Sequence, residues 1–215
     1  MTVPSRLRSR LIAILVSAPL LAGCGGLLTD APQRPLYRVN PTPTFPAGLP
    51  HVSAQLLVAT PATPAGLDTA RIALSRAPVS LDYFADAAWT DRVPFLVQTA
   101  LVEGFEKSAA ISAVGPEGLG LRADFVLETA IGDFEAMYDS PEGPPRIVVK
   151  LNEKLVRMPE RRIVAQTSVS RDAKATANSL VEIVRGFERA LGGAVEEVVT
   201  WTVGNRALSE RRTAR

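Results

Sequence analysis

The feature that most constrains the fold is a region of period-two alternation followed by one long helical stripe. Apolar residues recur at every second position in three successive segments, which prolines at 144–145 and at 159 separate. Such alternation places the apolar side chains of a strand on one face. We therefore predict an antiparallel meander with one buried and one hydrated face. Its inward residues are Ala123, Phe125, Leu127, Ile131, Ile147, Val149, Leu151, Leu155, Ile163, Ala165, Thr167 and Val169.

Two stretches have the period of an amphipathic helix instead. In residues 93–109, apolar side chains recur three and four positions apart, and Thr90 or Asp91 is placed to cap the first turn. A longer stripe covers about 173–200, and we expect Asp172 to cap it. The pair Gly192–Gly193 is expected to bend or end this second helix, because glycine is a poor helix former.

Shorter strand-like runs precede the meander. Segments 71–75 and 79–83 have the spacing of a hairpin, and 54–59 and 111–114 read as single strands. The predicted class is therefore α+β: one domain over 51–203, with a mainly antiparallel sheet and the two helices packed on it. Residues 204–215 are expected to form a basic, frayed tail.

The first 23 residues have the order of a bacterial secretory signal. Leu11 to Leu21 run almost wholly apolar, and a positive segment precedes them that contains Arg6, Arg8 and Arg10. This run is shorter than the roughly 20 apolar residues that a membrane-spanning helix needs. We interpret residues 1–23 as a cleaved signal peptide. The alternatives are an ordinary signal with a small-residue cleavage site, and a buried core segment.

Cys24 ends the signal in the sequence Leu-Ala-Gly-Cys and is the only cysteine of the chain. This order is typical of the bacterial lipobox, so we expect the thiol to carry acyl chains, such as palmitate, that anchor the mature protein. Gly25 follows, not the aspartate that we associate with retention at the inner membrane. The predicted location is therefore the inner leaflet of the outer membrane, facing the periplasm.

Residues 24–50 contain many prolines, which exclude a helix or a central strand. We predict that they form a tether, with a short edge strand at 37–39. The whole chain has 24 basic and 22 acidic residues, and cleavage of the signal removes three of the arginines. The net charge of the mature chain is therefore close to zero. A balanced charge argues against nucleic-acid binding, which needs a concentrated basic face.

Residues for catalysis are scarce. The only histidine is His51, and the chain contains neither a Gly-x-Ser-x-Gly elbow nor a phosphate-binding Gly-x-x-x-x-Gly-Lys loop. The glycine-rich run 115–120 lacks that lysine and reads as a turn. We therefore expect no enzyme activity, no catalytic residue, no metal site and no cofactor.

One acidic and aromatic cluster is the candidate site. Three aspartates, at 82, 86 and 91, alternate with the aromatic residues Tyr83, Phe84 and Trp89. A cation site or a sugar platform is conceivable here, but acidic residues before a helix and aromatic residues at a core edge explain the pattern more simply. If the cluster is functional, its aromatic residues suit partner docking. The arginines after 205 read as a solvated tail.

The order of these features resembles that of the ABC-type transport auxiliary lipoproteins, the PqiC-like family. The resemblance rests on the lipobox, Tyr37-Arg38-Val39, the run 71–76, Tyr83-Phe84 with Trp89, and Pro94 before a helix. It extends from Tyr37 to about Trp201. One departure is the segment 87–92, which contains fewer acidic residues and fewer prolines than the corresponding segment typical of the family. The resemblance therefore assigns no role to Trp89.

The resemblance implies a non-enzymatic periplasmic lipoprotein that attaches a lipid transport system to the outer membrane. Its implied partners are an Mce (MlaD-like) protein, an ABC permease and an ATPase. A competing hypothesis is a lipid or small-ligand carrier with a cavity between sheet and helix, and an unusual hydrolase ranks far behind. The sequence is also compatible with a homo-oligomer.

Overall fold

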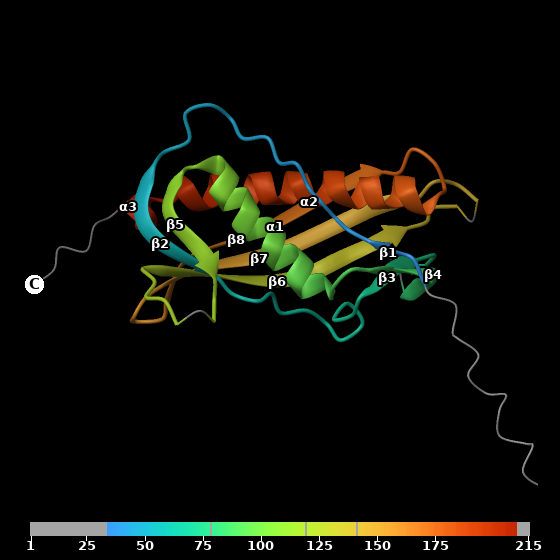
Figure 1. Cartoon of the computed structure of the whole chain (residues 1–215), viewed down its shortest axis with the longest axis horizontal. Helices are drawn as coiled ribbons and strands as arrows, with labels where there is room; N and C mark the ends of the chain where they lie inside the picture. Colours follow the sequence, from blue (N-terminus) through green and yellow to red (C-terminus); the bar gives the residue numbers. More distant parts are fainter. Residues whose placement is uncertain (1–33, 78, 119, 141, 210–215) are drawn as a thin grey trace, which may run out of the picture. The chain divides into compact units, whose positions relative to one another are not determined.

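The fold is known from a computed structural model that describes residues 34–209, apart from residues 78, 119 and 141. In that part, eight strands form one sheet and three helices accompany it (Figure 1). The strands are β1 (Leu36–Tyr37), β2 (Val52–Val58), β3 (Arg71–Ser75), β4 (Asp82–Trp89), β5 (Ile111–Pro116), β6 (Phe125–Met137), β7 (Arg146–Arg157) and β8 (Arg162–Lys174). The helices are α1 (Val93–Ser108), α2 (Leu180–Val203) and α3 (Arg206–Ser209).

The predicted meander is present as β6, β7 and β8. Both pairings are antiparallel, and cross-strand neighbours such as Thr129, Glu153 and Thr167 lie side by side on one face. The odd-numbered residues of β7 from Ile147 to Leu155 are buried, as their alternation predicted. This face of the sheet packs against the helices, so it forms the main hydrophobic core.

The expectation of a mainly antiparallel sheet was wrong for the remaining strands except β3 and β4, which form the predicted antiparallel hairpin. Among the described residues, four of the seven strand pairings are parallel, namely β1–β4, β2–β5, β2–β6 and β3–β6. The reason is the length of β6, which has 13 residues. Its free edge accepts β2 at Phe125–Leu127 and β3 at Ala136–Met137. The α+β class is retained.

The helix α2 begins later than predicted. Ser179 is its N-cap residue, and Asp172 lies in β8 opposite Val148. The apolar alternation of β8 continues into the helical stripe, so the sequence pattern did not show the boundary. Gly192 does not end the helix, which continues to Val203. The first helix, α1, also lacks a side-chain cap, because Asp91 Oδ1 accepts the neighbouring backbone N–H of Arg92 at 2.7 Å.

The proline-rich segment was predicted to be a tether up to Pro50, but its described part lies on the domain. Val39, Phe45 and Leu49 pack against the core cluster, and the backbone N–H of Asn40 donates to Glu188 Oε1 at 3.1 Å. Prolines exclude helix and ladder hydrogen bonds, but they do not prevent an extended chain from packing on helices. We call residues 38–50 the strap, which connects β1 to β2 (Figure 1).

Part of the segment that was expected to be a frayed tail is helical. Residues 206–209 form the short helix α3, in which Leu208 is buried. Arg157 Nη2 donates to the backbone oxygen of Ala207 at 3.1 Å and ties this turn to β7. In the described part of the chain, no helix combines the length and hydropathy needed to cross a membrane.

The helices α1 and α2 contact each other at a glycine of α1, which has no side chain. A Cβ atom at Gly104 of α1 would lie 2.2 Å from Val195 Cγ1 of α2, so only glycine permits this close approach. In helix interiors glycine normally costs about 1 kcal/mol relative to alanine. At Gly104 the contact with α2 offsets that cost.

Candidate functional site

Trp89, one of the three docking candidates, lies inside the core. Its side chain is 1% exposed, and its ring packs edge-on against Phe187 at 5.0 Å and Phe134 at 6.1 Å between centroids. The strand β4 extends to Trp89 and directs it toward α2, whereas the sequence placed the end of that strand at residue 83. A side chain so enclosed does not present a docking surface, so the expectation for Trp89 is corrected.

Tyr83 and Phe84 remain partly exposed at the start of the same strand. The Tyr83 hydroxyl donates to the backbone oxygen of Gly66 at 2.8 Å, and the Arg71 guanidinium lies 3.7 Å from the centre of its ring. These contacts fix the orientation of the tyrosine ring. Phe84 packs at the margin of the core and keeps part of its ring in solvent. Docking through Tyr83 and Phe84 stays a prediction.

A large bulge interrupts the pairing of β4 with β3. Arg71 is opposite Ala88 and Ala73 is opposite Tyr83, so Ile72 alone faces the four residues Phe84 to Ala87. Bulges of this kind redirect side chains and disrupt the strand ladder. Here the bulge exposes Ala85 and Asp86. On its other side β4 pairs only with the two-residue β1, so most of this edge has no neighbouring strand in the described part.

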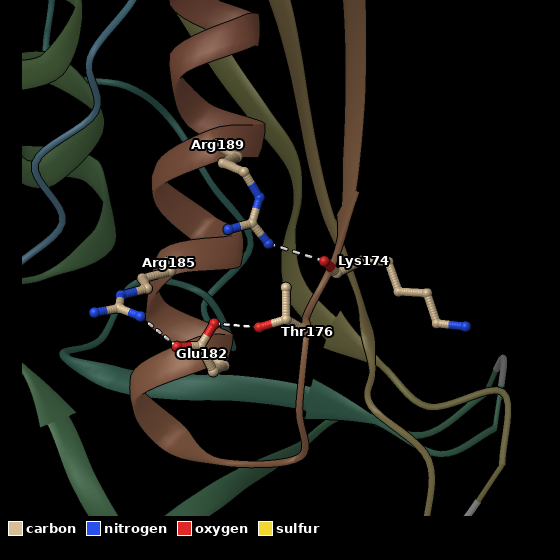
Figure 2. Close-up of polar contacts among 5 residues, drawn as sticks. All are labelled: Lys174, Thr176, Glu182, Arg185 and Arg189. Atoms are coloured by element: carbon tan, nitrogen blue, oxygen red, sulfur yellow. Dashed lines mark hydrogen bonds and ion pairs between the residues drawn. The ribbon is translucent and has the colours of Figure 1, made fainter.

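A polar network fixes the entry to α2, as Figure 2 shows. Glu182 accepts a hydrogen bond from Thr176 Oγ1 and pairs with Arg185 at 2.5 Å, so its carboxylate lies between the two. The Thr176 hydrogen bond and the arginine charges lower the pKa of Glu182 below its usual value. Arg189 Nη2 donates to the backbone oxygen of Lys174 at 2.9 Å. These contacts hold the turn between β8 and the helix.

The strap leaves a polar groove beside α2. A cavity of about 520 Å³ is open between them, and its charged lining residues are Arg185, Glu188, Arg189 and Glu196. Gly192 and Gly193 form part of its floor. A Cβ atom at Gly192 would be 3.7 Å from the strap residues Pro41 and Thr42, an ordinary van der Waals distance, so the strap lies directly against this part of the helix. Charges of both signs line the groove, which does not match the mostly apolar lining of a lipid site.

Glu153 is a buried acid that the sequence interpretation did not single out. It lies on the core face of β7 and is 1% exposed. Burial raises its pKa to about 7, and the hydrogen bond that Thr129 Oγ1 donates to its Oε2 at 2.8 Å opposes that rise. The period-two pattern that predicted Leu151 and Leu155 as buried also placed Glu153 on their face, and this signal was available in the sequence.

The space between the sheet and α2 is filled by side chains. Trp89, Phe134 and Phe187 are each at most 1% exposed and contact one another. In the described residues, no group of three or more His, Cys, Asp or Glu side chains is arranged to hold a metal ion. His51 is exposed and its Nδ1 lies 3.2 Å from the backbone oxygen of Ala109. Cys24, the predicted lipidation residue, lies outside the described residues.

Comparison with known proteins places this fold among lipoproteins. A family model for the ABC-type transport auxiliary lipoprotein component matches residues 36–204. A crystal structure of a Xanthomonas campestris protein of family DUF330 has 27% identity and a TM-score of 0.76, covering 82% of this chain and 99% of that one. A second solved structure, of an uncharacterized protein, has 14% identity and a TM-score of 0.59 over 72% of this chain and 95% of its own, which shows the fold alone.

A curated protein is also similar in sequence. An uncharacterized protein of Bradyrhizobium diazoefficiens is 30% identical over 154 residues, which are 71% of this chain but only 40% of the relative. The match to the family model spans almost the whole described domain. The chain therefore belongs to the family of ABC-type transport auxiliary lipoprotein components, and the resemblance drawn from the sequence is confirmed.

Proposed function

We propose that this protein is a non-catalytic docking component of an ABC-type system that moves lipids between the two bacterial membranes. Its partners in this proposal are an Mce (MlaD-like) protein, an ABC permease and an ATPase. The observation that carries the proposal is the family match over residues 36–204, because the auxiliary role belongs to the domain as a whole and not to a local motif.

The anchor of the proposal is Cys24, acylated and held in the inner leaflet of the outer membrane. Two acyl chains give lasting attachment, whereas one gives marginal and reversible binding. Gly25 supports the outer membrane as the destination, because no aspartate follows the cysteine. The domain then faces the periplasm, where the substrate-binding protein of such a system is found.

The packing of the core favours docking over carriage. A carrier needs a cavity that accepts acyl chains, and such sites are concave and mostly apolar. The aromatic side chains of Trp89, Phe134 and Phe187 occupy the position between sheet and α2 where a carrier would hold its lipid. Mass spectrometry of the purified unacylated domain distinguishes the two functions, since stoichiometric bound lipid would favour the carrier.

For the docking surface we propose the edge of β4 that carries Tyr83 and Phe84. Both side chains are partly exposed, and aromatic residues are enriched where proteins bind one another. The bulge beside them leaves backbone groups of β4 without a regular ladder, which suits a partner segment.

Crosslinking in living cells tests the proposal. The full chain, expressed from its own locus with an affinity tag, is crosslinked, purified under denaturing conditions and analysed by mass spectrometry. We expect enrichment of an Mce-type protein together with its permease and ATPase. A matched sample from cells that lack the Mce gene controls for chance capture. If neither an Mce-type protein nor a permease is enriched, the docking role is wrong.

A further inference from the structure

The pairing of β1 with β4 determines the side from which the chain enters the domain. Leu36 and Tyr37 pair in parallel with Ala88 and Trp89, and the backbone oxygen of Pro35 accepts the Ala88 N–H at 3.2 Å. Parallel strands run in the same direction. The chain therefore reaches β1 from the end of the sheet at which β4 begins.

Three connections of the fold meet at that same end. They join β3 to β4, β6 to β7, and β8 to α2. The backbone N–H of Tyr138 donates to Ser75 O at 2.8 Å, and the Tyr138 hydroxyl donates to Asn178 Oδ1 at 2.8 Å. The Arg76 guanidinium lies 5.5 Å from the centre of the Tyr138 ring. Tyr138 therefore links all three connections into one surface.

Exposed apolar side chains concentrate on this surface. Three of the seven large apolar side chains that are exposed in the described part lie on these connections or in the first turn of α2. They are Val79 at 97%, Leu81 at 44% and Val181 at 52% exposure. Single exposed apolar residues need no explanation, but a concentration of them marks an interaction surface. We call Val79, Leu81 and Val181, with Arg76 and Tyr138, the leader-side end.

Turn chemistry does not explain these residues. The connection between β3 and β4 is a hairpin, and the tips of hairpins favour glycine, asparagine and aspartate. Val79 and Leu81 have no such conformational role, and Val79 is almost fully in solvent. The charges nearby are balanced, since Arg76 and Lys174 are accompanied by Asp82 and Asp139. A surface of this kind is suited to apolar insertion and not to electrostatic attraction.

We propose that Val79 and Leu81 insert into the lipid surface in which Cys24 is anchored, so that the leader-side end faces the outer membrane. The inference rests on the acylation proposed above. Nine residues lie between Cys24 and Arg34, and over these ten steps of about 3.5 Å a fully extended chain spans at most about 35 Å. The anchor therefore confines this end to the neighbourhood of the bilayer, where even a weak apolar contact is populated.

Spin labelling of the acylated protein tests the insertion. The thiol of Cys24 carries the lipid, so the variant Val79→Cys has one free thiol, which accepts the label. A matched control is Leu121→Cys, because Leu121 is 58% exposed and precedes β6, at the opposite end of that strand. Both proteins are reconstituted through their acyl chains into vesicles of phosphatidylethanolamine with a minority of phosphatidylglycerol. Collisions of the label with oxygen and with a water-soluble nickel complex are then compared.

We expect the ratio of oxygen to nickel accessibility to be several-fold higher at position 79 than at position 121. Adding Leu81→Asp should lower that ratio at position 79, since a carboxylate resists entry into the bilayer. Equal ratios at the two positions would overturn the proposal. Exclusion of both reagents at position 79 would indicate contact between protein copies and would overturn it too. The mass of the purified protein reports acylation separately, and an unmodified Cys24 would overturn the anchoring on which both proposals depend.

Discussion

The indole ring of Trp89 lies edge-on to the ring of Phe187, with an angle of 83° and 5.0 Å between the ring centroids. This contact joins the end of β4 to the first half of α2. Aromatic pairs in such a geometry contribute about 0.5–1.5 kcal/mol beyond the area that they bury. Trp89 is therefore a residue on which the attachment of the helix to the sheet depends.

We predict that Trp89→Ala lowers the free energy of unfolding by roughly 3–5 kcal/mol, the usual cost of removing a large buried side chain. Trp201→Ala is the control, because Trp201 lies on the margin of the core and is only partly buried. It should cost clearly less. Urea denaturation of the soluble domain measures both values. Similar losses for the two variants would show that Trp89 is not a central core residue.

Gly104→Ala is predicted to destabilise the domain, although the same change normally stabilises a helix by about 1 kcal/mol. The added Cβ would lie 2.2 Å from Val195 Cγ1, so α1 would have to move away from α2. Val195 is β-branched and has little freedom to rotate away. The unfolding free energy of the variant should therefore fall, and thermal unfolding followed by circular dichroism measures it.

Two further variants make this test specific. Gly193→Ala is the matched control in the other helix, since its Cβ would meet only the flexible side chain of Arg171 at 3.4 Å. It should be neutral or stabilising. Combining Gly104→Ala with Val195→Ala should recover part of the lost stability, because the second change removes the colliding methyl group. Additive losses in the double variant would contradict the proposed contact.

Glu153 is predicted to make the stability of the domain depend on pH. Its pKa is raised from 4.5 to about 7 because the side chain is buried. Between these values the folded state holds a proton that the unfolded state has lost, so stability falls as the pH rises from about 4.5 to about 7. Above pH 7 the loss is complete and amounts to about 3 kcal/mol as an upper figure, since one pKa unit corresponds to about 1.4 kcal/mol.

The variant Glu153→Gln isolates this effect. Glutamine cannot ionise, and its amide oxygen still accepts the hydrogen bond from Thr129. The variant should be more stable than the wild type at pH 8 and should show a smaller change in unfolding free energy between pH 5 and pH 8. Denaturant titrations at the two pH values measure both quantities. An unchanged pH dependence would show that Glu153 does not titrate in this range.

Cys24→Ser is predicted to release the protein from the membrane or to leave its signal uncleaved, because serine does not accept the thioether-linked lipid. Fractionation of cells followed by detergent extraction distinguishes these forms. The domain itself should remain folded, since its core begins at Tyr37. Membrane extraction identical to that of the wild type would contradict the anchoring role.

The sequence predicted the strands and helices of this fold better than it predicted which strands pair with one another. Alternation identified the three long strands, and β6 and β7 each bury most of one face. In β8 only Val169 is buried, and Ile163, which was predicted to point inward, is 50% exposed beyond the irregularity in its pairing with β7. The hairpin that pairs β3 with β4 was predicted. The parallel pairings of β2 and β3 with β6 were missed, since short strands contain no signal for the strand that they join. The boundary between β8 and α2 was missed for a related reason, as Ala173 continues the alternation of the strand and the residues after Ser179 continue the stripe.

The candidate site was predicted only in part. Tyr83 and Phe84 are at the surface as expected, but Trp89 is buried because β4 continues six residues beyond Tyr83. Local composition does not reveal on which face of a bulged strand an aromatic side chain emerges. The packing of the strap on the domain was not predicted. Its prolines restrict the backbone conformation, but they give no signal for the surface on which the chain packs. Its contacts with the core come from Val39, Phe45 and Leu49.

The docking role is tested most directly by a photocrosslinking amino acid placed at Phe84 in the full-length protein in its native cells. The account predicts an ultraviolet-dependent adduct with the Mce-type protein. The same amino acid at Lys154, which is exposed on the sheet face away from the helices, should give no such adduct. An adduct from position 154 alone would show that the docking surface is the sheet face away from the helices. No adduct with any component of the transport system from either position would contradict the account.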